Sequence, residues 1–265
     1  MSDRQRLRAS LVSVACLLRG LPLFFCASPK TPLRVLCIMA LDTLHVLRHS
    51  RPLQRKNIRE LGMFLDFQAC TNAAWDQKEL CEAEYQAIRQ RLEQAGLGMW
   101  IDGYLNQVRE LERRRPSIGG DRRRFDDVRS YREAVARLSL AAVTAIALNA
   151  KSLEDGIRET HGDGDVQTLF RIVMQCQIID DVLDYEEDLF AGLPSFLTAC
   201  VSLPRAMALT AEASRDYGAS RGRGRSSLNG ALPLRMALSG VSAVSTLVVR
   251  VGRRRHRTAV RQVAQ

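Results

Sequence analysis

The sequence contains few of the residues that interrupt helices and few of those that build sheets. Seventeen Gly and eight Pro among 265 residues leave long stretches without a helix breaker. Leu, Ala and Arg dominate where β-branched residues would have to dominate a sheet protein, which disfavours an all-β fold. The seven cysteines form no C-x-x-C pair, which disfavours a disulfide framework or zinc ribbon. No uncharged stretch near the C-terminus reaches the roughly 20 apolar residues of a membrane-spanning helix.

Apolar residues recur at helical spacing along most of the chain. Overall, 46% of the residues are apolar and 26% are charged. This pattern predicts an all-α protein, a single-domain bundle of about eight helices. The expected domain organisation is a helical domain at 1–217, a linker rich in Gly, Ser and Arg at 218–230, and a C-terminal helix with a basic tail at 231–265. The predicted helices cover residues 7–25, 32–49, 55–95, 97–114, 125–150, 165–190, 195–214 and 231–250.

The net charge of +10 is unevenly distributed. Residues 61–200 carry 16 basic and 24 acidic residues, whereas residues 201–265 carry 12 basic and 2 acidic ones. The basic C-terminal region could contact an anionic membrane surface, or it could be a last core helix with a solvated tail. Three arginines alternating with glycines at 221–225, without interleaved aromatics, make nucleic acid a disfavoured partner.

The N-terminal residues resemble the start of a signal peptide, with arginines before the apolar run that begins at Leu11. Arg19 interrupts that run and Pro22 follows it, so we do not expect secretion. The expected location is therefore the cytoplasm, with a peripheral membrane contact through the basic tail.

The most informative segment is an apolar helix whose second half is crowded with carboxylates. Positions 180, 184, 187 and 188 share one helix face, with 181 beside them. Like charges at this spacing destabilise a helix, and a divalent cation removes the conflict. Hard oxygen ligands suit Mg²⁺, with Mn²⁺ as a substitute. The alternative is a surface helix end with a solvated acidic face. The predicted metal ligands here are Asp180, Asp181, Asp184, Glu187 and Asp188.

A site for a metal and a diphosphate needs a second wall of oxygen ligands. Asn72 and Asp76 are four residues apart and share a helix face. We expect them to complete the Mg²⁺ site, with the helices that hold residues 66–79 and 180–188 facing each other across a central cavity.

Three motifs resemble those of known enzymes. The stretch Gln177-Ile-Ile-Asp-Asp-Val-Leu-Asp184 resembles the second aspartate-rich motif of trans-prenyl diphosphate synthases. Continued to Asp188 and Gly192, it resembles equally well the second motif of squalene and phytoene synthases. Tyr131-Arg-Glu-Ala-Val-Ala136 is similar to the Y-x-x-x-V-A helix of the latter, and Asn72-x-x-x-Asp76 falls where their first D-x-x-x-D belongs. No Arg-Arg-Gly follows this first motif, which favours the squalene/phytoene branch over head-to-tail chain elongation.

This resemblance implies the class I isoprenoid synthase fold, with helices around a central cavity. It also implies an enzyme that ionises an allylic prenyl diphosphate and couples or rearranges the prenyl chain with the help of Mg²⁺. Asp180, Asp184 and Tyr131 would then be catalytic. The candidates for binding the diphosphate are Lys78, Arg132 and Arg137, and those for lining the prenyl pocket are Phe64, Phe67, Trp75 and Tyr131.

Two other functions remain open from the sequence. The first is a non-catalytic helical protein that binds prenyl lipid or a membrane surface. The second is a metal-carboxylate protein of other chemistry, for which Asp42-x-x-His45-x-x-x-His49 offers a transition-metal pattern. Such a histidine pair is more often an ordinary helix end.

Overall fold

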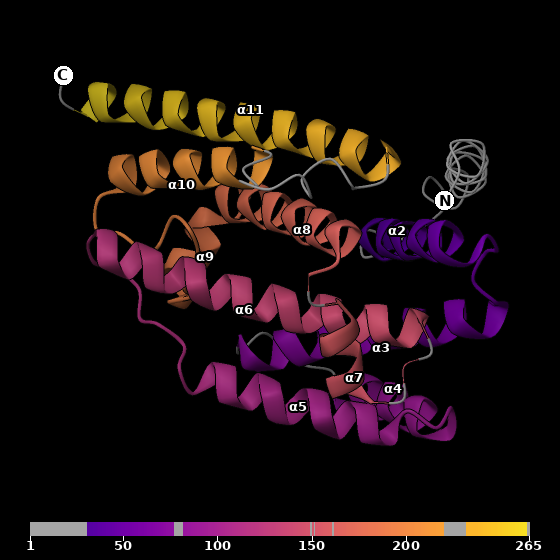
Figure 1. The fold of residues 1–265 in the computed structure, drawn as a ribbon. Coiled ribbons are helices and arrows are strands. Elements are labelled where there is room, and N and C mark those ends of the chain that lie inside the picture. The colour runs from indigo at the N-terminus through magenta and orange to yellow at the C-terminus, as the bar shows by residue number, and fades with distance from the viewer. Residues whose placement is uncertain are drawn as a thin grey trace. The chain divides into compact units, whose positions relative to one another are not determined.

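The computed structural model describes residues 31–76, 82–148, 150, 152–160, 162–219 and 232–263. Every regular element in these ranges is a helix, which confirms the all-α prediction. The predicted helix at 7–25 and most of the predicted linker lie outside them. The helices are α2 (Thr31–His49), α3 (Arg55–Trp75), α4 (Glu82–Gln94), α5 (Gly98–Glu112), α6 (Arg122–Ala147), α7 (Leu153–Thr160), α8 (Gly164–Leu183), α9 (Tyr185–Ala191), α10 (Leu203–Gly218) and α11 (Leu232–Val263) (Figure 1).

The chain forms two compact units, where the sequence predicted a single bundle with a C-terminal appendage. Unit 1 comprises Met1–Arg109, Leu138–Val166 and Gly230–Leu234. Unit 2 comprises Glu110–Arg137, Gln167–Asn229 and Arg235–Gln265. Both units are discontinuous in sequence. The basic C-terminal helix is therefore part of unit 2, and the first half of α6 belongs to unit 2 while its second half belongs to unit 1.

Short polar side chains begin several helices. The Asp121 carboxylate accepts the backbone N–H groups of Arg123 and Arg124 at the start of α6, at 2.9 and 3.3 Å. The Asp163 carboxylate accepts the N–H groups of residues 165 and 166 in the same way at the start of α8. Such caps satisfy backbone donors that have no partner within the helix, which is why these helices begin where they do.

The helices differ from the predicted ranges at several points. The predicted helix 55–95 is interrupted, because α3 ends at Trp75 and α4 begins at Glu82. The predicted helix 195–214 begins only at Leu203. Before it, the backbone N–H of Ser195 donates to the Thr198 hydroxyl at 2.8 Å, so a turn closed by side chains replaces the helix. The third difference is α7, which was not predicted, because a helix of eight residues is too short to show a clear apolar periodicity.

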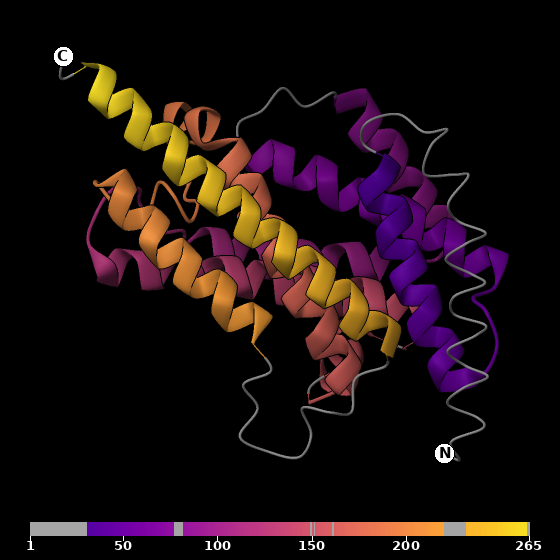
Figure 2. The ribbon, with the colours of Figure 1, turned by 90° about the horizontal axis from the view of Figure 1, so that it is seen from above.

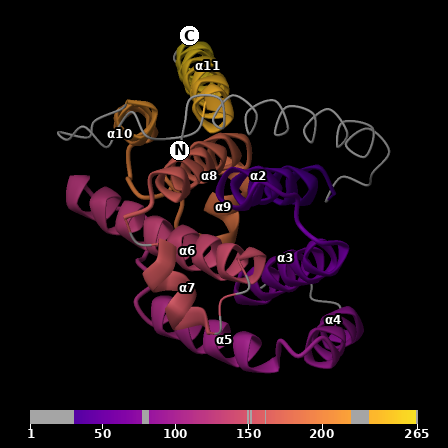
Figure 3. The same ribbon diagram turned by 45° about the vertical axis from the view of Figure 1, so that its right-hand side comes forward.

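The core of unit 1 is built around aromatic side chains from α3, α4 and α5. Phe64 lies edge-on to Tyr104, with ring centroids 5.4 Å apart, and Phe67 stacks on Tyr85 at 5.6 Å. Phe64, Phe67 and Tyr104 are fully buried. Helix α3 packs between α2 and α4, as Figure 3 shows. This cluster accounts for the arrangement of α3 to α5.

Helix α7 approaches α6 closely within unit 1, through Gly156. A Cβ atom added there would lie 2.1 Å from the Cβ of Ala145 and 3.3 Å from its Cα. We therefore expect Gly156→Ala to lower the free energy of unfolding by roughly 1–3 kcal/mol, because overpacking outweighs the gain in helix propensity. Urea unfolding of the two proteins measures the difference.

Gly62 in α3 provides the matched control, because nothing lies within 4 Å of the position of its Cβ. Gly62→Ala should raise the free energy of unfolding by up to about 1 kcal/mol. If Gly156→Ala were equally stabilising, the close approach of α6 and α7 would be contradicted.

In unit 2, buried polar side chains join α8, α10 and α11. The Gln175 amide donates to the carbonyl oxygen of Ser214 at 2.7 Å, and the Ser214 hydroxyl donates to the Gln175 amide oxygen at 3.0 Å. The hydroxyls of Ser214 and Ser245 are 3.0 Å apart. Figure 2 shows α11 running beside α10 and over α8. Because each group is satisfied by another in the set, the contacts hold α11 at a defined position along its neighbours.

One segment of α11 meets the length and composition of a membrane-spanning helix. It covers Leu232–Arg254 and is mostly exposed. The uncharged stretch within it, 236–249, is shorter than a span, and the segment reaches sufficient length by including the charged positions on either side. Length and composition alone do not separate a spanning helix from a core helix or an amphipathic one.

Candidate functional site

The carboxylates of the acidic segment follow the junction between α8 and α9. Asp184 lies between the two helices with φ −99° and ψ 16°. The Asp184 N–H still donates to the Asp180 carbonyl at 2.8 Å, and the Asp188 N–H donates to the Asp184 carbonyl at 2.9 Å. These bonds close the last turn of α8 and the first turn of α9, so Asp180, Asp184 and Asp188 succeed one another at i, i+4 spacing across the junction. Asp180 is exposed, and the other two are partly buried.

Asp181 is buried inside unit 2, with 1% of its surface exposed. Its Oδ1 forms an ion pair with Arg132, and its Oδ2 accepts the Phe196 N–H at 2.6 Å. Burial raises the pKa of Asp181 to about 6, while the Arg132 guanidinium and the Phe196 N–H oppose that rise. Asp181 is therefore ionised at neutral pH. The sequence predicted it to be a metal ligand, whereas in the structure both of its oxygens already have protein partners.

The burial of Asp181 could have been read from its spacing. It lies three residues after Ile178 and seven after Met174, both fully buried on the inner face of α8. Asp180 lies one residue earlier, about 100° around the helix, and faces solvent. The adjacent aspartates therefore lie on different sides of α8, and Asp180 is the one placed to meet a ligand from solvent.

Arg132, predicted to bind diphosphate, is the partner of Asp181. Burial opposes its positive charge, but Asp181 first and then Asp188 raise the pKa of its guanidinium above the ordinary value. Its Nε is buried without a hydrogen-bond partner. Arg132 thus contributes a positive charge directly behind the acidic segment, where it reduces the repulsion among the carboxylates.

Asn72 and Asp76 lie at the C-terminal end of α3, in unit 1. The Asp76 N–H donates to the Asn72 carbonyl at 2.9 Å, so the two residues keep the predicted i, i+4 register. Asn72 is exposed and Asp76 is partly buried. Lys78 lies outside the described residues. Because Asp180 and the other acidic-segment residues belong to unit 2, the pairing of the two motifs across one site remains a prediction.

The residues predicted to line a prenyl pocket do not share one environment in the structure. Phe64 and Phe67 lie in the buried aromatic core of unit 1, and Trp75 is 38% exposed at the end of α3. In unit 2, the Tyr131 hydroxyl donates to the Glu112 carboxylate at 2.6 Å. The structure thus gives Phe64 and Phe67 a packing role in the core and Tyr131 a carboxylate partner.

Arg137, the other predicted diphosphate ligand in unit 2, has a half-exposed side chain. Its guanidinium carbon lies 3.8 Å from the centre of the Phe170 ring, a cation–π contact, and its Nη2 lies 3.8 Å from Oε2 of Glu133. It is the described basic candidate that keeps substantial exposure, at 49%.

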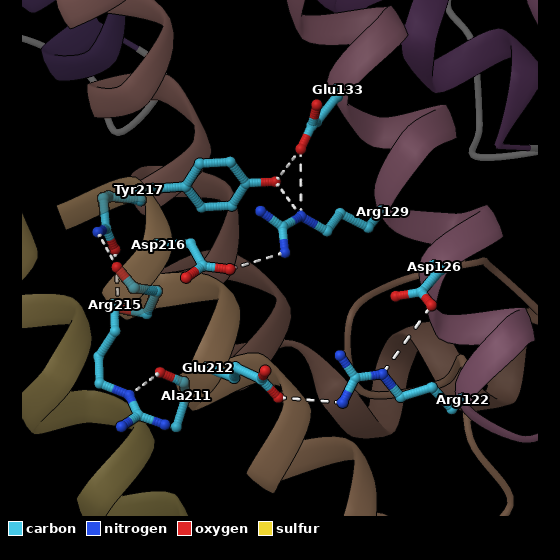
Figure 4. A network of polar contacts seen from close by, with 11 residues as sticks. Arg122, Asp126, Arg129, Glu133, Ala211, Glu212, Arg215, Asp216 and Tyr217 are labelled. Atoms are coloured by element: carbon cyan, nitrogen blue, oxygen red, sulfur yellow. Dashed lines mark hydrogen bonds and ion pairs between the residues drawn. The ribbon is translucent and has the colours of Figure 1, made fainter. Parts of the chain in front are cut away.

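A second polar cluster in unit 2 was missed by sequence reasoning. Tyr217 donates its hydroxyl to Glu133 at 2.6 Å, and Arg129 donates to Glu133 at 3.2 Å and to Asp216 at 3.2 Å (Figure 4). Burial and the bond to Glu133 raise the pKa of Tyr217. The i, i+4 spacing of Arg129 and Glu133 could have indicated an ion pair on α6. Because Arg129 is paired with both Glu133 and Asp216, we interpret this cluster as a structural link from α6 to α10.

The histidine pattern in unit 1 holds a turn. The Asp42 carboxylate accepts the Leu53 N–H at 2.7 Å, and His45 Nδ1 is 2.8 Å from the Arg51 carbonyl oxygen, to which it donates. The His45 and His49 rings are in contact, with centroids 4.6 Å apart. These bonds fix the connection from α2 to α3. Within the described ranges, no group of three or more His, Cys, Asp or Glu is arranged to hold a metal ion by itself.

The comparisons with known proteins give no family assignment. No protein-family model, no curated protein and no solved structure matches the chain. A functional proposal must therefore depend on the motif residues and their surroundings in the structure.

Proposed function

We propose that this protein is a Mg²⁺-dependent class I isoprenoid synthase, similar to squalene and phytoene synthases. It would ionise an allylic prenyl diphosphate and couple or rearrange the prenyl chain. The observation that carries the proposal is the i, i+4 succession of Asp180, Asp184 and Asp188, whose backbones are joined by hydrogen bonds across the α8–α9 junction. A stripe of three carboxylates costs stability through repulsion, and a bound cation offsets that cost.

The donor set fits the proposed metal. Carboxylate oxygens at the edge of solvent suit Mg²⁺, which typically uses one or two protein carboxylates and completes its shell with water and substrate phosphate. A metal bound by few protein ligands also agrees with the acidic segment, because the carboxylates of the described residues do not enclose an ion by themselves. Asp180, Asp184 and Asp188 would hold the metal in unit 2, with exposed Glu187 beside them, and Asn72 and Asp76 would hold it in unit 1. Bound there, Mg²⁺ would neutralise the charge that develops on the departing diphosphate.

The protein's own residues would position the substrate. The Asp181–Arg132 pair fixes the rotation of α8, and with it the direction in which Asp180 points. Arg137 would be the diphosphate contact in unit 2, since Arg132 is already paired. The same segment exposes the apolar side chains of Leu189 and Phe190, the latter at 96%. Carboxylates for the head group and apolar side chains for the hydrocarbon chain are what a prenyl diphosphate requires.

The direct test is turnover of labelled substrate. Purified protein is incubated with allylic diphosphates of ten, fifteen and twenty carbons, with and without Mg²⁺, and released pyrophosphate and extractable products are measured. We expect Mg²⁺-dependent release of pyrophosphate and an apolar product from at least one substrate. If none of the three is consumed, the proposed function is contradicted.

A second candidate function is a non-catalytic protein that binds prenyl lipid or a membrane surface, and the exposed apolar face of α11 favours it. The same assay separates the two functions. A non-catalytic protein would bind a prenyl diphosphate, for example in equilibrium dialysis, without releasing pyrophosphate.

A further inference from the structure

One side of α11 exposes a continuous apolar stripe. It contains Met236, Val244, Leu247 and Val251, and Met236 and Leu247 are 66% and 60% exposed. Their spacings of eight, three and four residues place them on one face of a helix. Gly240 and Ala243 lie on the same face and are also exposed, so no charged side chain interrupts it between Met236 and Leu247. A contiguous apolar face of this kind marks a surface that binds something.

The opposite side of α11 is packed against unit 2. Leu238, Ser245 and Val249 are buried, and Ser245 takes part in the polar contacts with α10 and α8. Farther along, the Arg253 guanidinium donates to the Met207 carbonyl at 2.8 Å. A Cβ atom on Gly252 would lie 3.0 Å from Met207 and 3.2 Å from Val182. The helix is therefore fixed to unit 2 by one face while its apolar stripe faces outward.

The charge of α11 complements an anionic surface. Residues 232–265 contain seven arginines and no Asp or Glu. Arg250 is exposed at the edge of the stripe, between Leu247 and Val251, and Arg235 is exposed one residue before Met236. An apolar face bordered by arginines is typical of a helix that lies in a membrane interface, with the apolar side chains among acyl chains and the guanidinium groups at lipid phosphates.

We infer that α11 docks unit 2 onto an anionic lipid membrane, with its axis in the plane of the surface. The contacts made by the buried face oppose a crossing, although α11 is long enough for one. A spanning α11 would have to leave α8 and α10, which would break the contact between the Ser245 and Ser214 hydroxyls and the bond from Arg253 to the Met207 carbonyl. Nucleic acid would bind the arginines through its phosphates, but it has no apolar surface that would cover Met236 or Leu247. This inference does not rest on the proposed enzymatic function.

Vesicle flotation with the full chain tests the inference. We expect binding to vesicles of phosphatidylcholine with phosphatidylglycerol, and much weaker binding to phosphatidylcholine alone. Met236→Ser and Leu247→Ser should each weaken binding on the order of tenfold, because each removes apolar surface from the bilayer. Arg250→Gln should weaken binding about fivefold, since one basic residue near an anionic surface contributes roughly 1 kcal/mol.

Met99→Ser is the matched control, because Met99 is more exposed than either residue, at 88%, but lies on α5. It should bind vesicles like the unchanged protein, and all four variants should keep the thermal stability of the free protein. Bound protein should be released by alkaline carbonate. The inference would be overturned if the Met236 and Leu247 variants bound normally while Arg250→Gln did not, which indicates a general polyanion site. Resistance to carbonate extraction would overturn it in favour of a spanning helix.

Discussion

Asp181→Asn is expected to lower the free energy of unfolding by roughly 3 kcal/mol, because it leaves the partly buried Arg132 guanidinium without its ion-pair partner and the Phe196 N–H without its charged acceptor. Asp181 is 1% exposed, and its carboxylate is the ion-pair partner of Arg132 and the acceptor of the Phe196 N–H. Chemical denaturation at neutral pH, where the carboxylate is charged, measures the loss.

A double variant separates the loss of the pair from the loss of one partner. In Arg132→Met with Asp181→Leu, both buried charges are removed, and we expect part of the stability to return. The return should be incomplete, because the Phe196 N–H would still lack its acceptor. If Asp181→Asn were as stable as the unchanged protein, the pair would not be a structural element of unit 2, and the prediction that Asp181 binds metal would regain its support.

Asp184→Asn is expected to change the stability of the protein little and its catalytic turnover strongly. Asp184 starts α9 without a side-chain capping bond, so its carboxylate can be lost without stranding a partner. Removing one charge from the acidic stripe should change the free energy of unfolding by about 0.5 kcal/mol or less. Mg²⁺-dependent turnover of the prenyl diphosphate should fall on the order of 10²-fold or more, as expected when one group that stabilises transition-state charge is removed.

The ligand dependence of thermal melting distinguishes a metal ligand from a bystander. Mg²⁺ with pyrophosphate should raise the melting temperature of the unchanged protein more than that of Asp184→Asn. Glu186→Gln is the control, because it removes a charge from an exposed residue of α9 that is not among the predicted ligands. An equal rise in the unchanged protein and Asp184→Asn would show that Asp184 does not bind the metal.

The helical architecture could be predicted because it depends on local spacing. Helices α2, α5 and α6 follow the predicted ranges to within three residues. The break after α3 could not be predicted, because no Gly or Pro marks it and Asp76 ends the helix without a sequence signal. The turn before α10 depends on hydrogen bonds between Ser195 and Thr198, and the spacing of apolar residues carries no signal of such side-chain bonds.

The candidate site shows a similar division between local and distant information. The register of Asp180, Asp184 and Asp188 is local, and helical periodicity predicts it. The partner of Asp181 is Arg132, 49 residues earlier, and no spacing rule connects the two. The same holds for Glu133 and Tyr217, which are 84 residues apart. Distant pairings depend on how the helices pack, and one sequence carries no direct signal of packing.

The discontinuity of unit 2 has a consequence for synthesis on the ribosome. Its last segment, Arg235–Gln265, supplies one wall of its core, and α11 follows every other element of the unit. During translation, Gln175 and Ser214 emerge long before Ser245, with which Ser214 pairs in the finished protein. The nascent chain thus exposes the inner faces of α8 and α10 until α11 is released, a period in which a chaperone can bind them. A deletion that removes residues from Leu232 onward therefore leaves unit 2 an unfinished folding intermediate.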